Sequence, residues 1–156
     1  MRRWRITRRS SSSTATGRRF IDLERATRRL PAAQAMPTVG SQLEHHLGAD
    51  DEVAIAAITA SELLHGVHRA TAEHRGRREA FVEAVLAAFP TIPFDLLLAR
   101  VHARLWAALG AAGTDVRAHD RLVAATAISA GWRVGSANTQ HFRRVQGLEV
   151  VEVSFG

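Results

Sequence analysis

The stretch Ile55-Ala-Ala-Ile-Thr-Ala-Ser-Glu-Leu-Leu-His-Gly66 joins a short apolar run to an amphipathic helix that carries a carboxylate. We expect a buried strand over residues 52–58, because this run is apolar and follows an acidic turn. A helix is expected from Thr59 to about Ala70, with Glu62 in its first turn. A strand that leads directly into a helix is the repeating unit of a parallel sheet covered by helices.

The rest of the chain continues this alternation of strands and helices. Further expected helices span residues 20–30, 39–47, 79–89, 95–109 and 120–130, and further extended segments span 91–94, 132–137 and 149–153. Strands that are apolar on both faces predict an α/β fold, in which a central, mostly parallel sheet lies between helices. Residues 20–156 are expected to form a single domain.

Composition narrows the class of protein. The chain has 156 residues, of which 46% are hydrophobic, so it is long enough for one globular domain with its own core. It has no cysteine, which excludes disulfides and thiolate metal sites. No apolar run approaches the roughly 20 residues of a membrane-spanning helix. A cytoplasmic protein that does not contact the membrane is the expectation.

The positive charge is concentrated at the N-terminus. All 21 basic residues are arginine, and residues 1–30 hold ten of them against Asp22 and Glu24. Residues 1–19 are rich in arginine and serine and are predicted to be a disordered arm. Such an arm would bind phosphate backbones without sequence preference, so a general nucleic-acid binder is one alternative for the protein.

Two carboxylates occupy similar positions, and each has a structural explanation of its own. Glu62 follows Thr59 at the spacing of a capping box, in which the glutamate bonds back to the first amide of the helix. Asp120 opens the expected helix over residues 120–130, where the helix dipole favours an acid. Two acids at the starts of two buried helices are also what a divalent-metal site needs.

Three segments together resemble a known family. Ile58-Thr-Ala-Ser-Glu-Leu-Leu-His-Gly66, His119-Asp-Arg-Leu-Val-Ala-Ala-Thr-Ala127 and Ser136-Ala-Asn-Thr-Gln-His-Phe-Arg-Arg-Val-Gln-Gly-Leu148 are similar, in order and spacing, to three blocks of PIN-domain ribonucleases. The VapC toxins of VapBC toxin–antitoxin systems are the best match, over about residues 50–153. The resemblance implies a three-layer α/β/α domain that cleaves RNA with Mg²⁺ or Mn²⁺.

The resemblance also assigns roles to residues and implies partners. Glu62 and Asp120 match the second and third acids of the family and are expected to bind the metal. Ser136 and Asn138 match a polar pair that helps to orient the site. The implied partners are a VapB-type antitoxin, a second copy of the chain and RNA such as tRNA or rRNA.

The chain departs from the family pattern at two places. The family begins with an apolar strand that ends in an aspartate, and the expected position of that aspartate holds Thr16. The first strand is therefore expected to be missing or disrupted, and Asp22 to cap or solvate a helix six residues later. His141 stands where many relatives carry a fourth acid, and Asp115 lies in the loop before Asp120. On this basis a weak or inactive nuclease is expected.

Two further questions stay open in the sequence. With an incomplete metal site, the chain could be a non-catalytic module that binds an antitoxin or itself, for which the helix over residues 95–109, including Trp106, offers apolar surface. Four arginines after the Glu62 helix could contact RNA phosphates or belong to an ordinary solvated face. These arginines are Arg69, Arg75, Arg77 and Arg78.

Overall fold

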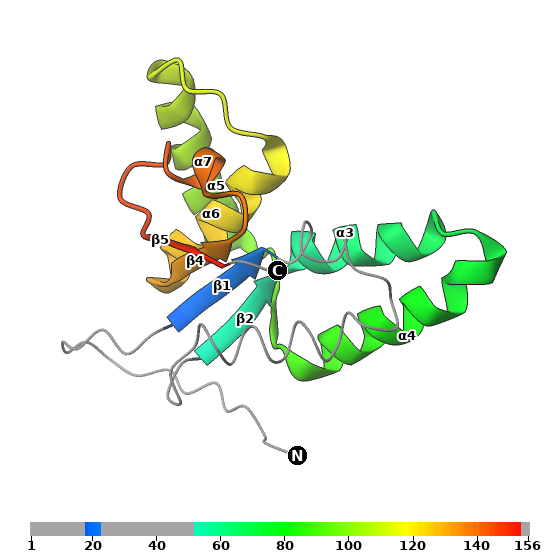
Figure 1. Ribbon diagram of the computed structural model, residues 1–156. Coiled ribbons are helices and arrows are strands. Elements are labelled where there is room, and N and C mark those ends of the chain that lie inside the picture. The colour runs from blue at the N-terminus through cyan, green and yellow to red at the C-terminus, as the bar shows by residue number, and fades with distance from the viewer. Residues whose placement is uncertain (1–17, 23–51, 154–156) are drawn as a thin grey trace.

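Five parallel strands form the centre of the computed structural model, which describes residues 18–22, by their backbone, and residues 52–153 (Figure 1). The strands are β1 (Arg18–Asp22), β2 (Glu52–Ala56), β3 (Thr91–Ile92), β4 (Arg133–Ser136) and β5 (Val150–Glu152). They lie in the order β3-β2-β1-β4-β5, and each neighbouring pair is parallel. The predicted parallel sheet is therefore confirmed.

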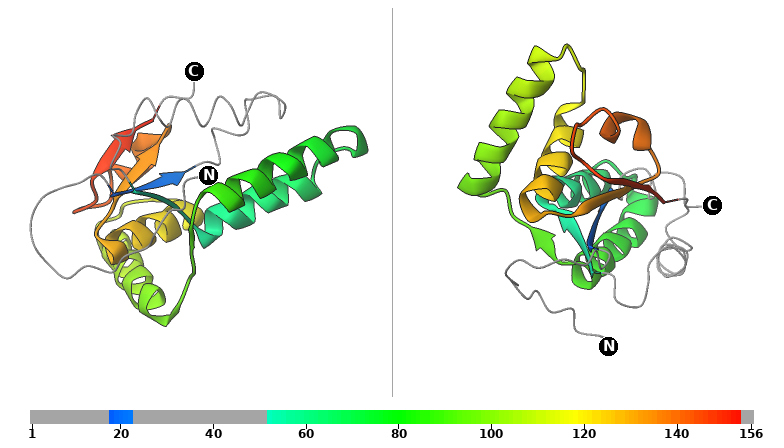
Figure 2. Two further views of the ribbon diagram at one scale, coloured as in Figure 1. Left: turned by 90° about the horizontal axis from the view of Figure 1, so that it is seen from below. Right: turned by 90° about the vertical axis from the view of Figure 1, so that its left-hand side faces the viewer.

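Helices cover the sheet in two groups. They are α3 (Ala57–His68), α4 (Ala72–Ala88), α5 (Leu96–Ala111), α6 (Ala118–Ala130) and α7 (Thr139–Phe142). The helices α3 and α4 pair as a long antiparallel hairpin that projects beyond the sheet, while α5, α6 and α7 gather on the other side (Figures 1 and 2). This arrangement confirms the expected α/β/α layering.

The strand β2 shows how helices pack against both faces of the sheet. Successive side chains of a strand point to opposite faces. Val53 and Ile55 belong to a buried cluster with α3 and α4, whereas Ala54 and Ala56 belong to a second cluster with α5, α6 and α7. Alanines on the second face leave room for α6, whose Ala124, Ala125 and Ala127 are fully buried. The sheet is thus packed on both sides, as its apolar run predicted.

The strand β1 corrects the expectation of a missing first strand. It lies between β2 and β4, in register with Arg133–Ser136 of β4, and its last residue, Asp22, is level with Ser136. The helix expected over residues 20–30 is therefore wrong for residues 20–22, and residues 23–30 lie outside the described residues. The sequence misled because Arg18 and Arg19 precede only two apolar residues, Phe20 and Ile21.

Other boundaries differ from expectation for local reasons. The helix α3 begins at Ala57, two residues early, and α4 begins at Ala72, seven residues early. The first two turns of α4 are exposed and polar, so they carry no apolar periodicity that could have marked them. Thr16, the rest of the arm up to residue 17 and the helix expected over 39–47 lie outside the described residues.

None of the helices within the described ranges, 18–22 and 52–153, is long and apolar enough to cross a membrane.

Phe142 tests the packing of the second core cluster. It is fully buried between α6 and the sheet, so Phe142→Ala should lower the free energy of unfolding by about 3–5 kcal/mol. Phe94 is a matched control because its ring is half exposed, and Phe94→Ala should cost less than about 1 kcal/mol. Urea unfolding of both variants measures the difference, and equal losses would contradict this core.

Candidate active site

One edge of the sheet gathers the candidate residues. In parallel strands the carboxyl ends share an edge, here called the carboxyl edge, where ligands of α/β proteins collect. The strand β2 leads directly into α3 at this edge. The helix α6 ends at Ala130, just before β4, so it runs back across the sheet and begins near the same edge. The fold thus explains why Asp120, in the first turn of α6, approaches α3.

Glu62 and His119 make the contact that joins α3 to α6. The His119 Nδ1 atom is within hydrogen-bonding distance of Glu62 Oε1. The Glu62 side chain is only 14% exposed, whereas the His119 ring is more than half exposed. Because His119 precedes Asp120 directly, the contact brings the start of α6 beside Glu62 of α3, and a metal ion shared by Glu62 and Asp120 stays a prediction. The sequence analysis gave His119 no role, although it lies within the quoted block.

Asp120 has a second histidine beside it. The Asp120 Oδ2 atom lies 3.0 Å from His141 Nδ1, and the two side chains are 16% and 25% exposed. Neither atom has a hydrogen-bond partner, although both are buried. The pair is therefore close in space without the alignment that a hydrogen bond requires. Two buried, unpartnered polar atoms that face each other are costly unless a further group completes them.

The capping explanation for Glu62 is wrong. The residue before α3 is Ala56, and the start of the helix has neither a side-chain cap nor an acid in its first turn. Thr59 is inside the helix, fully buried, and its hydroxyl has no hydrogen-bond partner. Glu62 lies in the second turn of α3, beyond reach of the first amides. Its burial beside His119 thus needs another reason than capping.

Ser136 and Asn138 shape the turn that carries His141. Ser136, at the end of β4, is fully buried, and its hydroxyl accepts a hydrogen bond of 3.0 Å from the backbone N–H of Asn138. Asn138 precedes α7, and its side chain does not cap that helix. His141 follows within the same single turn of helix. The serine thus supports the direction in which α7 leaves the sheet.

The two remaining acids differ in position. Asp22 ends β1 at the carboxyl edge, with its Cα level with that of Ser136. Asp115 is exposed in the loop before α6, and its carbonyl accepts a hydrogen bond of 3.2 Å from Arg144. Its carboxylate has no described contact with Glu62 or Asp120.

The donor set suits a divalent cation, although the described side chains alone do not complete a cluster. Within residues 52–153, no three histidine or acidic side chains meet as a metal site. They form two pairs instead, Glu62 with His119 and Asp120 with His141. The unpartnered oxygen of Asp120 is the kind of ligand that Mg²⁺ and Mn²⁺ prefer. Asp22, the last residue of β1, is the further acidic residue that the strand register brings to this edge.

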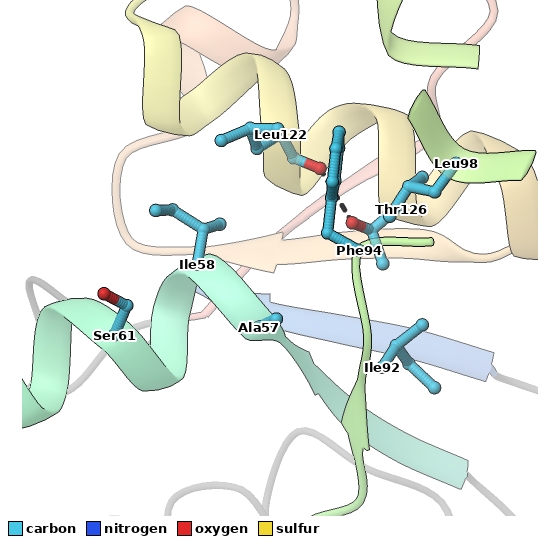
Figure 3. Close-up of a pocket in the computed structure, with 8 residues that line it drawn as sticks. All are labelled: Ala57, Ile58, Ser61, Ile92, Phe94, Leu98, Leu122 and Thr126. Carbon is cyan, nitrogen blue, oxygen red and sulfur yellow. Dashed lines mark hydrogen bonds between the residues drawn. The ribbon is translucent and has the colours of Figure 1, made fainter. Parts of the chain in front are cut away.

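An apolar pocket of about 290 Å³ lies between the start of α3 and the helices α5 and α6 (Figure 3). It is lined by Ala57, Ile58, Ser61, Ile92, Phe94, Leu98, Leu122 and Thr126. The Thr126 hydroxyl donates to the carbonyl of Leu122, so it offers no free donor to the pocket. A pocket of this composition suits an apolar side chain rather than a charged substrate.

The contact between α5 and α6 involves the guanidinium of Arg121, which packs on α5 and does not pair with Asp120. The guanidinium of Arg121 stacks on the Trp106 ring, with its central carbon 5.0 Å from the ring centroid, and donates a 2.5 Å hydrogen bond to the Val116 carbonyl. Burial, and then the charge of Arg121, lower the pKa of the neighbouring His102 below its usual value. Arg121 therefore stabilises the helix pair.

The four candidate RNA-binding arginines lie along the hairpin of α3 and α4. Arg69, Arg75 and Arg77 are exposed, and Arg75 donates to the carbonyl of Ala70 at 3.3 Å. The guanidinium of Arg78 packs over Gly66, where a Cβ would lie 3.1 Å from it. These contacts fit a structured hairpin, and an interaction with RNA stays a prediction.

Sequence comparison identifies relatives of the chain. A family model described as the PIN domain matches residues 38–148. Ribonuclease VapC1 of Rickettsia felis is 39% identical over 101 residues, which cover 64% of this chain and 75% of that protein. The tRNA(fMet)-specific endonuclease VapC of Salmonella typhimurium is 29% identical over 96 residues, which cover 62% of this chain and 71% of that protein.

Solved structures share the fold. VapBC of Salmonella typhimurium, solved with bound DNA, gives a TM-score of 0.72 at 21% identity, covering 88% of this chain and 99% of that chain. VapBC-5 of Mycobacterium tuberculosis, from the VapBC family of toxin–antitoxin systems, gives a TM-score of 0.65 at 28% identity, covering 88% of this chain and 98% of that chain.

Two substitutions test the reassignment of Thr59. Since its hydroxyl is buried without a partner, Thr59→Val should raise the free energy of unfolding by about 1 kcal/mol. A capping residue would behave in the opposite way and lose about 0.5–2 kcal/mol. Asp95 is the internal comparison, because its carboxylate accepts a 2.8 Å hydrogen bond from the N–H of Leu98. Asp95→Ala should therefore destabilise the protein, as thermal and urea unfolding would measure.

Proposed function

Because the chain belongs to the PIN domain family, we propose that it is a metal-dependent endoribonuclease whose site lies at the carboxyl edge of the sheet. The observation that carries the proposal is the convergence of α3 and α6, in which Glu62 meets His119 directly beside Asp120. The curated relatives are named ribonucleases, one of them specific for tRNA(fMet). An RNA of the tRNA or rRNA class is accordingly the proposed substrate.

Asp22, Glu62 and Asp120 are the proposed ligands of Mg²⁺ or Mn²⁺. Support for Asp22 comes from β1, which ends at this residue level with Ser136, and the family's first strand likewise ends in an aspartate. The acid expected at position 16 is therefore matched six residues later. With three carboxylates available, we propose an active nuclease in place of the weak one that the missing strand had implied.

The chain's own residues prepare this site in separate ways. His119 holds one oxygen of Glu62 and so restricts the rotation of that carboxylate. Ser136 supports the turn that leads through Asn138 to His141. When bound, the divalent ion supplies Lewis acidity and offsets the negative charge that grows on the phosphate during an in-line displacement. The buried oxygen of Asp120, which has no hydrogen bond, also favours a cation.

An antitoxin and a second copy of the chain are the proposed protein partners, and the cytoplasm is the proposed location. The relatives of known structure are VapBC and FitAB assemblies, which supports an antitoxin of the VapB type. The exposed apolar side chains of Leu96 and Leu97, 70% and 64% exposed, flank the pocket at the start of α5. Surface of this kind is typical of an interface between subunits, and Trp106 is a further exposed apolar side chain of α5.

A non-catalytic binding module is the second candidate function. The same apolar surface on α5 favours it, because that surface is independent of the acidic edge. The module would bind an antitoxin or itself without a bound metal, so metal binding and RNA cleavage separate the two candidates.

Loss of single carboxylates tests the nuclease. Asp22→Asn, Glu62→Gln and Asp120→Asn should each lower Mg²⁺- or Mn²⁺-dependent RNA cleavage by at least about a hundredfold, since each removes a charge that the cation and the phosphate need. The rate is measured on a labelled RNA with and without a chelator. Asp115→Asn is the matched control and should cleave like the unaltered chain.

Thr16→Asp distinguishes the two possible first acids. If Asp22 is the ligand, Thr16→Asp leaves cleavage unchanged and does not rescue Asp22→Asn. An unaltered chain that is inactive but gains activity from Thr16→Asp would contradict the assignment. Inactivity of the unaltered chain together with no metal binding would favour the non-catalytic module.

Self-association is tested at the start of α5. Leu97→Glu places a charge in the exposed apolar surface and should shift the protein toward monomers by at least about tenfold in dissociation constant, because the charge would be desolvated in the interface. Sedimentation velocity measures the shift. Ala80→Glu also adds a glutamate at an exposed position, on α4 across the sheet from α5, and should leave association unchanged.

A further inference from the structure

The geometry of Asp120 and His141 says more about the proposed metal site than the positions of Glu62 and Asp120 do. Their facing atoms, Oδ2 and Nδ1, are 3.0 Å apart, buried, and without hydrogen bonds. An aspartate that merely neutralised a protonated histidine would align with its N–H, since charge-assisted hydrogen bonds are the strong ones. This pair instead brings an oxygen and a nitrogen side by side.

The separation is that of two neighbouring ligands on one ion. Ligands at right angles on an octahedral cation, each about 2.0–2.1 Å from it, are about 2.9 Å apart. The observed 3.0 Å agrees with this spacing. The distance between the two atoms therefore allows both to contact one ion.

The backbone holds His141 in this position. It lies in α7 between the buried residues Thr139 and Phe142, and Phe142 is fully buried in the core. The backbone N–H of Arg143 donates to the Thr139 carbonyl at 2.9 Å. Since α7 is anchored on both sides of the histidine, the imidazole is presented to Asp120 by a fixed turn rather than by a free loop.

We propose that His141 is a direct nitrogen ligand of the ion, and that this site therefore prefers Mn²⁺ to Mg²⁺. The inference rests on the proposed function, in which Glu62 and Asp120 bind a divalent cation. Magnesium is a hard ion that selects oxygen ligands and keeps its waters. Imidazole nitrogen favours transition metals, and at a given nitrogen or oxygen site affinity rises from Mn²⁺ onward through the series.

Charge strengthens the preference. A fourth carboxylate at position 141 would add a negative charge, which a hard cation needs most. A neutral imidazole adds a donor atom and no charge, so the site loses electrostatic attraction for Mg²⁺ while it gains a softer ligand. His119 contributes differently, because it contacts Glu62 Oε1 and acts on the orientation of that carboxylate.

Metal binding without RNA tests the selectivity. Calorimetry of the full chain with Mn²⁺ and with Mg²⁺ should give a dissociation constant at least about tenfold lower for Mn²⁺. His141→Asp restores an oxygen ligand and should reduce this ratio by about tenfold. His74→Asp is the matched control, because His74 is exposed on α4, remote from the carboxyl edge, and the ratio should not change. An equal ratio in the unaltered chain and in His141→Asp would overturn the proposal.

Pulsed electron paramagnetic resonance of bound Mn²⁺ tests whether the His141 nitrogen is a ligand of the ion. A ¹⁴N coupling is expected in the unaltered chain and in His119→Ala, and its loss is expected in His141→Asp. Bound Mn²⁺ without a nitrogen coupling would overturn the role of His141 while the proposed nuclease stands. If neither ion binds and Glu62→Gln changes nothing, the metal site and the proposed function fail together.

Discussion

Among the described strands, β1 alone joins the two halves of the sheet. It pairs with β2 on one side and with β4 on the other, while β3 pairs only with β2 and β5 only with β4. The candidate site depends on this constraint, because β1 sets the spacing between the end of β2, which leads to α3, and the end of β4, which leads to α7. A shift of β1 by one residue would move its last residue away from Ser136 and reverse the face of every side chain along it.

The strand that matters most was also the hardest to find in the sequence. The strand β2 and the helix α6 were predictable because their buried residues, 53–56 and 123–127, are apolar except for Thr126. Arg18 and Arg19 open β1 with two charges, so no buried-strand pattern exists there. The strand β1 takes its position by pairing with β2 on one side and β4 on the other. This pairing belongs to the tertiary structure and is not encoded in the five residues of the strand alone. The exposed first half of α4 was missed for the related reason that it has no apolar face.

The sequence singled out Glu62 and Asp120, but it did not predict the histidine that each of them contacts. Adjacent residues on a helix point about 100° apart. On α6, His119 reaches Glu62 of α3, whereas Asp120 reaches His141 of α7. A single turn of α6 thus connects two elements that are almost eighty residues apart in the sequence. Residue type and spacing reveal which acids open buried helices, but they do not reveal which neighbour each side chain meets.

The electrostatic balance of this edge explains why the proposed site suits a cation rather than an arginine. The largely buried carboxylate of Asp120 needs a positive partner. Arg121 is the nearest in sequence to Asp120, yet it stacks on Trp106 and donates to the Val116 carbonyl. The carboxylates face imidazoles instead, which donate or coordinate without a permanent charge. An arginine beside Asp120 would close the proposed site with a salt bridge, whereas the imidazole of His141 leaves the charge of Asp120 for an ion.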